Sequence, residues 1–95
     1  MKTDIYLIDE EYKVAVTGLE FQIGGRILKE ILPISERPTY KYQLSHYCKQ
    51  EITATDVYIP GKENVPLSNK DDAKRYLLNY LKAFTSHKVV PNPLY

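Results

Sequence analysis

The alternation of apolar and polar residues predicts two short β-strands near the start of the chain, residues 5–9 and 12–17. The acidic run Asp9-Glu10-Glu11 lies between them and is interpreted as a hairpin turn. After Gly18 the apolar positions shift by one residue, which is typical of a β-bulge or a bend in a strand.

A second hairpin is predicted at Gly24-Gly25, because two glycines supply the positive φ angles of a tight turn. Folding the chain at this point places Phe21 opposite Leu28. Residues 26–32 then form the returning strand, although their apolar positions also fit one face of a short helix that ends at Pro33. A strand is favoured, because so short a segment without a good N-cap makes a poor helix.

Residues 35–38 are expected to form a loop, and residues 40–49 then alternate cleanly, as in a strand with one buried face. The inward set is Tyr40, Tyr42, Leu44, His46 and Cys48, and the outward set is Lys41, Gln43, Ser45, Tyr47 and Lys49. Residues 53–59 are a further β-prone run, and Pro60-Gly61 after them is a turn signal.

The clearest pattern is that of an amphipathic helix over about residues 69–86. Ser68 or Asn69 can cap its first turn, and acidic side chains follow at the positive end of the helix dipole. The apolar residues with helical spacing are Ala73, Tyr76, Leu77, Tyr80, Leu81 and Phe84.

These elements predict an α+β fold, in which an antiparallel sheet of four to five strands carries the C-terminal amphipathic helix on one face. A chain of 95 residues has the size of one domain. Residues 1–95 are therefore expected to form a single domain that ends in an extended tail, residues 88–95.

The composition is that of a small globular protein, with 43% apolar and 26% charged residues. Its 13 basic and 12 acidic residues nearly balance, whereas a domain that holds nucleic acid through phosphates is normally more basic. Neither a membrane-spanning run nor a signal-peptide pattern is present, so a cytoplasmic location is expected. The unusual feature is nine tyrosines without a tryptophan, which suits half-buried positions and protein interfaces.

The single cysteine, Cys48, lies two positions after His46, which raises the hypotheses of a catalytic thiol and of a partial metal site. In a strand the two side chains share a face but are about 6–7 Å apart at the backbone, longer than a nucleophile–base hydrogen bond. Zinc would need further ligands such as His87, and the spacing gives no support for them. Packing in the core is the favoured interpretation, and no catalytic residue, metal or cofactor is predicted.

Two other motifs have structural explanations. Gly24-Gly25 followed by Arg26 lacks the pattern of a phosphate-binding loop, and a hairpin turn accounts for it. Asp71 and Asp72 raise the hypothesis of a divalent-cation site, but a capped helix N-terminus explains both.

The function class that remains is a non-enzymatic interaction module, with a protein as the favoured partner and self-association as a second use of an open sheet edge. No membrane or small-molecule substrate is indicated. Such a module would suit a phage or mobile-element accessory that acts on a host complex. The alternative is a nucleic-acid-binding regulator that uses the outward face of residues 40–49. The candidate partner-binding residues are Lys41, Gln43, Ser45, Tyr47, Lys49, Leu94 and Tyr95.

Overall fold

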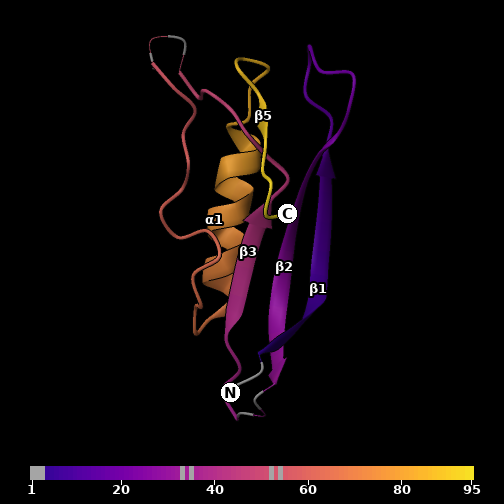
Figure 1. Ribbon diagram of the computed structural model, residues 1–95, viewed down its shortest axis with the longest axis vertical. Helices are drawn as coiled ribbons and strands as arrows, with labels where there is room; N and C mark the ends of the chain where they lie inside the picture. Colours follow the sequence, from indigo (N-terminus) through magenta and orange to yellow (C-terminus); the bar gives the residue numbers. More distant parts are fainter. Residues whose placement is uncertain (1–3, 33, 35, 52, 54) are drawn as a thin grey trace.

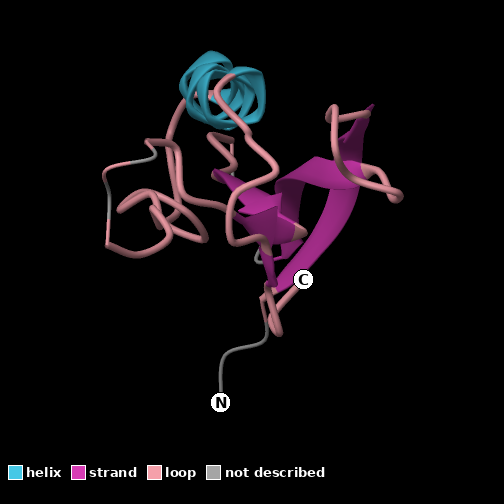
Figure 2. Ribbon diagram, turned by 90° about the horizontal axis from the view of Figure 1, so that it is seen from above, coloured by secondary structure: helices cyan, strands magenta, loops and turns pink. Residues whose placement is uncertain are grey.

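The computed structural model describes residues 4–95, except residues 33, 35, 52 and 54. Its elements, in chain order, are β1 (Ile5–Val14), β2 (Ile23–Leu32), β3 (Tyr40–Leu44), β4 (His46–Tyr47), α1 (Lys70–Lys82) and β5 (Val90–Pro91) (Figure 1). Strands β1, β2 and β3 form an antiparallel sheet in that order, and β4 pairs with β5 in a separate antiparallel ribbon. Figure 2 shows the helix on one side of the strands.

The predicted α+β class, with antiparallel strands and one helix, is confirmed for the described residues. The predicted sheet of four to five strands is wrong, because the larger sheet has three strands and the other two form the ribbon. The strand favoured for residues 26–32 is confirmed as part of β2. Three residues of the predicted segments, Pro33, Ser35 and Ala54, lie outside the described residues.

The turn predicted at Asp9-Glu10-Glu11 is wrong, because β1 runs through these residues as one strand. Ile8 and Glu10 pair with neighbouring residues of β2, so Asp9 between them is the extra residue of a β-bulge. The bulge interrupts the alternation of apolar residues, and this interruption has the same appearance in the sequence as a turn.

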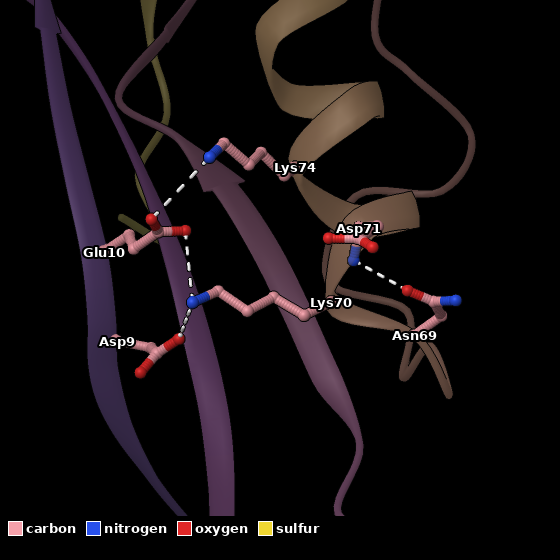
Figure 3. A network of polar contacts seen from close by, with 6 residues as sticks. All are labelled: Asp9, Glu10, Asn69, Lys70, Asp71 and Lys74. Atoms are coloured by element: carbon pink, nitrogen blue, oxygen red, sulfur yellow. Dashed lines mark hydrogen bonds and ion pairs between the residues drawn. The ribbon is translucent and has the colours of Figure 1, made fainter.

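The bulge also joins β1 to the start of α1 through ion pairs (Figure 3). Lys70 Nζ lies 2.6 Å from Asp9 Oδ2 and 3.4 Å from Glu10 Oε2. Lys74 Nζ lies 3.9 Å from Glu10 Oε1, one helical turn further along. The hydrogen bond to Asp9 raises the pKa of Lys70, so the lysine stays charged.

The helix begins where the sequence predicts, with Asn69 as its N-cap. The Asn69 side-chain oxygen accepts a hydrogen bond from the backbone N–H of Asp71 at 2.7 Å (Figure 3). The helix ends at Lys82, before the predicted end near residue 86, and Phe84 is buried from the turn that follows. The buried helix residues, which pack against β2 and β3, are Ala73, Leu77, Tyr80 and Leu81.

The first hairpin turns at residues 15–22, so the turn and pairing predicted around Gly24-Gly25 are wrong. Gly18 supplies the positive φ angle, +96°, in this turn. The two adjacent glycines lie inside β2, where a side chain at Gly24 would meet the Tyr95 hydroxyl and one at Gly25 would obstruct the helix. A Cβ atom on Gly25 would lie 2.6 Å from Leu77 Cδ1, so the glycine lets α1 approach the sheet closely.

The strand predicted for residues 40–49 is interrupted at Ser45, which separates β3 from β4. The Ser45 N–H donates to the carbonyl of Gly24 at 2.9 Å, and the Ser45 hydroxyl accepts from the Gly24 N–H at 2.8 Å. Beyond this bend the alternation is lost, since Tyr47 and Cys48 are 8% and 0% exposed. The expectation that Tyr47 faces outward is therefore wrong.

The C-terminal tail is held against the bend at Ser45. Asn92 is buried, its backbone N–H donates to the Ser45 carbonyl, and its side-chain amide donates to the Leu44 carbonyl, both at 2.8 Å. These bonds place β5 beside β4 and give the tail a defined position.

Replacing Gly25 with Ala should destabilise the fold by about 1–3 kcal/mol, because the new methyl group forces Leu77 to move in a packed core. Urea unfolding of the variant and the wild type measures this change. Gly61→Ala is the matched control, since no atom lies within 4 Å of the site of its Cβ. Equal stabilities for the two variants would contradict the close approach of α1 at Gly25.

Candidate functional site

A pocket of about 300 Å³ opens between α1 and the segment that follows β4. Four of its lining residues are tyrosines, and none carries a formal charge at neutral pH. We call it the tyrosine groove, and its residues are Tyr42, Gln50, Tyr58, Pro60, Tyr76, Asn79 and Tyr80.

Three parts of the chain supply this lining. Tyr42 comes from β3, and Tyr76 and Tyr80 are one turn apart on α1, so both project from the same side of the helix. The rings of Tyr42 and Tyr76 are stacked with 6.2 Å between their centroids. Tyr58, from the segment after β4, stacks on Tyr80 with 5.9 Å between centroids. The aromatic walls of the groove are thus tied to the core on both sides.

The hydroxyl of Tyr80 fixes the segment that carries Tyr58. It accepts a hydrogen bond from the Cys48 N–H at 3.1 Å and donates one to the Tyr58 carbonyl. The Tyr58 N–H in turn donates to the Cys48 carbonyl at 2.9 Å. Burial raises the pKa of Tyr80, so its hydroxyl remains protonated as this network requires.

Tyr42 forms part of the groove and is 1% exposed. Its hydroxyl has no hydrogen-bond partner within the described part of the chain. Burial raises the pKa of Tyr42, and the nearby negative charge of Glu63 raises it further. The Tyr42 hydroxyl is therefore a protonated donor at any physiological pH.

Glu63 is occupied by other partners. Its carboxylate accepts hydrogen bonds from the Tyr47 hydroxyl and from the Leu44 N–H, the latter at 2.7 Å. Burial and this hydrogen bond raise the pKa of Tyr47. Tyr47, which the sequence pattern placed on the partner-binding surface, is instead a buried residue that holds the segment around Glu63.

The other residues expected on the outward face of the 40–49 segment make contacts within the chain. Lys41 Nζ lies 4.5 Å from the centre of the Tyr6 ring. The Gln43 side chain accepts from Arg26 Nε at 2.7 Å and donates to Asn64 at 2.6 Å. The nucleic-acid alternative uses this outward face of residues 40–49. Its Lys41 and Gln43 side chains already have partners within the chain, and the Tyr47 ring is buried and not exposed on this face.

Lys49 and the two tail residues have separate surroundings. The Lys49 N–H donates to the carbonyl of His87 at 3.0 Å, which joins the segment after β4 to the turn after α1. Tyr95 lies under Arg26, with 4.2 Å between the guanidinium carbon and the ring centre. Leu94 beside it is 74% exposed. The structure thus does not gather the predicted residues into one continuous exposed patch.

Cys48 and His46 have different partners. The Cys48 thiol is fully buried and accepts a hydrogen bond from the Thr85 N–H, with 3.4 Å between sulfur and nitrogen. His46 Nδ1 lies 2.7 Å from the Ser45 hydroxyl oxygen, and its ring packs on Phe21. Burial lowers the pKa of His46. Among the described residues, no cluster of three or more histidine, cysteine or acidic side chains is arranged to hold a metal ion.

The second candidate surface is the outer edge of β1, the first strand of the sheet. No described segment pairs with this edge, whereas the outer edge of β3 is covered by two hydrogen bonds between Tyr40 and Leu67, each 2.8 Å. Aliphatic side chains are exposed at the start of β1 and on the adjoining end of β2, where Ile5 pairs with Leu32. We call this surface the apolar end, and its residues are Ile5, Leu7, Ile8, Ile31 and Leu32.

The sequence pattern missed both surfaces. The tyrosine surplus was its only general signal for the groove, with the helical spacing of Tyr76 and Tyr80 as a local one. For the apolar end, the signal was the pair Leu7-Ile8. A half-buried strand alternates apolar and polar residues, whereas these two neighbours are both apolar.

Comparison with protein-family models, with curated proteins and with solved structures finds no match to this chain. In the described part of the chain, no helix has the length and apolar character that crossing a membrane requires.

Replacing Tyr80 with Phe should destabilise the protein by about 1–3 kcal/mol, because the buried Cys48 N–H loses its partner. The same substitution should lower the free energy of local opening around Tyr58. The amide hydrogen exchange rate of Tyr58 should then rise roughly tenfold for each 1.4 kcal/mol of that decrease. Tyr12→Phe, on β1, is the control and should change neither quantity. If the Tyr58 amide exchanges at the wild-type rate in Tyr80→Phe, the hydroxyl does not fix this segment.

Proposed function

We propose that this protein is a small non-enzymatic interaction module that binds another protein through the free edge of β1. The observation that carries this proposal is the apolar end, where an unpaired strand edge and exposed aliphatic side chains coincide. An extended segment of a partner adds to such an edge through backbone hydrogen bonds, and alternate side chains supply specificity.

The two halves of β1 differ in how well they resist unwanted pairing. Proteins protect edge strands with charged side chains and bulges. The second half of β1 has both, since the bulge at Asp9 is followed by Glu10, Glu11 and Lys13. Residues 5–8 carry no charged side chain, and Ile8 is 52% exposed. The register shift between Ile5 and Tyr6 places its extra residue, Ile31, on β2 and not on the edge strand. A strand that is protected over one half only is suited to pair through the other half.

The charges that flank residues 5–8 favour a different protein over a second copy as the partner. If two copies paired antiparallel over this segment, with Ile5 opposite Ile8, Asp4 of one copy would lie opposite Asp9 of the other. Like charges directly opposite destabilise a strand pair. Asp9 is already paired with Lys70, so we propose that the partner segment is apolar at its centre and basic at the end that faces Asp4.

The chemistry of the interior supports a role without catalysis. The only thiol is buried and bonded to Thr85, and its neighbouring histidine is turned to Ser45. A free buried thiol also suits a reducing compartment, so we propose that the module acts in the cytoplasm.

Replacing Ile8 with Lys should weaken partner binding at least about tenfold without changing the thermal midpoint, because an edge lysine opposes strand addition. The measurement is quantitative affinity capture from the native host with wild-type and variant bait, followed by a titration with the captured protein. Ile59→Lys, at a site 59% exposed and away from β1, is the matched control and should bind as the wild type does.

Three results would contradict the proposal. The first is equal capture by Ile8→Lys and wild-type bait. The second is a wild-type dimer in light scattering that Ile8→Lys dissociates, since a second copy would then occupy the edge. The third is binding of DNA or RNA that weakens steeply with salt and with Lys41→Ala, which would support the nucleic-acid alternative.

A further inference from the structure

We propose that the tyrosine groove is a second, separate binding site, and that its ligand is a proline-rich protein segment in the polyproline II conformation. This proposal does not rest on the edge of β1, because the groove is built from β3, α1 and the segment after β4. Its volume, about 300 Å³, is at the lower end of the range for ligand pockets, about 300–1,000 Å³.

The electrostatics of the groove select an uncharged ligand. Its lining contains tyrosine, glutamine, asparagine and proline side chains, all of which are neutral. The carboxylate of Glu63, whose charge acts on Tyr42, does not line the groove and already accepts hydrogen bonds from Tyr47 and Leu44. A phosphate or a charged side chain that entered the groove would lose its hydration and find no opposite charge there. The free-energy cost of such desolvation is high.

The donors of the groove match a polyproline II backbone. This conformation has no internal hydrogen bonds, so its carbonyl groups accept from a binding partner, while proline itself has no N–H to satisfy. The side-chain amides of Gln50 and Asn79 and the hydroxyl of Tyr42 can donate to such carbonyls. Proline rings pack on aromatic walls such as those that Tyr58 and Tyr76 provide.

The Tyr42 hydroxyl is the donor in the groove that most directly indicates a ligand. Tyr42 is 1% exposed, and its hydroxyl has no partner among the described residues. The hydroxyl is not one of the fully buried polar atoms without a partner, so it keeps solvent contact and is free to donate to a ligand in the groove. A carbonyl group of the ligand at the floor of the groove would satisfy this hydroxyl.

The groove is also largely formed before a ligand arrives. The Tyr80 hydroxyl bonds hold Tyr58 in place, and the two stacked ring pairs fix the aromatic walls. A rigid groove and a stiff polyproline II segment lose little conformational entropy when they associate.

The test is a titration of isotopically labelled protein with an acetylated polyproline peptide of about ten residues, followed by amide chemical shifts. A glycine–serine peptide of equal length is the control ligand, and cellohexaose and choline are competing ligand classes that also contact aromatic rings. We expect shifts at Gln50, Tyr58 and Asn79 with polyproline alone.

Two substitutions that preserve the fold examine the site itself. Tyr42→Phe keeps the buried ring, removes the hydroxyl and should weaken polyproline binding about fivefold, the equivalent of one net hydrogen bond. Asn79→Ala, on an exposed helix position, should also weaken binding. Tyr12→Phe and Ile8→Lys should bind polyproline as the wild type does, which separates this site from the edge of β1.

The proposal is overturned if polyproline shifts no groove amide, or if Tyr42→Phe and Tyr12→Phe bind it equally. It is also overturned if cellohexaose or choline shifts the groove amides and polyproline does not. None of these results would affect the binding of a partner at the edge of β1.

Discussion

The position of α1 on β2 and β3 determines both candidate surfaces. Gly25 has no side chain, so Leu77 packs directly on β2, while Lys70 reaches across to the bulge in β1 at Asp9. The helix packs on the face formed by β2 and β3, and no described segment pairs with the outer edge of β1. The flank of the same apolar helix face, with Tyr76 and Tyr80, forms one wall of the tyrosine groove.

The two surfaces differ in chemistry, which is why we assign them different ligands. The edge of β1 offers unpaired backbone groups beside aliphatic side chains, and such a surface binds a strand. The tyrosine groove offers ring faces and neutral donors, and such a surface binds a segment without hydrogen-bond donors or charge. A small domain with two such surfaces on separate elements can hold two segments at the same time, from one partner or from two.

Local signals in the sequence predicted the elements that depend on local interactions. The cap at Asn69 and the helical spacing of Leu77 and Tyr80 located α1, and the apolar run in residues 26–32 located β2. The errors arose where the backbone departs from regular alternation. The bulge at Asp9 has the appearance of a turn in the sequence, and the bend at Ser45 buries Tyr47, which regular alternation would place outward.

The candidate sites could be predicted only in part, because they depend on contacts between distant residues. Nothing local to Tyr58 indicates that its carbonyl meets the hydroxyl of Tyr80, yet that bond places Tyr58 in the groove. The tyrosine surplus indicated an interaction surface without locating it. Leu94 and Tyr95 were named from the tail alone, whereas Arg26, far away in sequence, covers the Tyr95 ring.

The most direct test of the central claim, that β1 binds a partner protein through its free edge, is amide hydrogen exchange along β1. In the free protein, the outward amides of residues 5–8 should exchange rapidly, while those of β2 are protected on both sides. Adding the captured partner should protect the outward amides. Protection of these amides in the free protein, or exchange that the bound partner leaves unchanged, would contradict the claim.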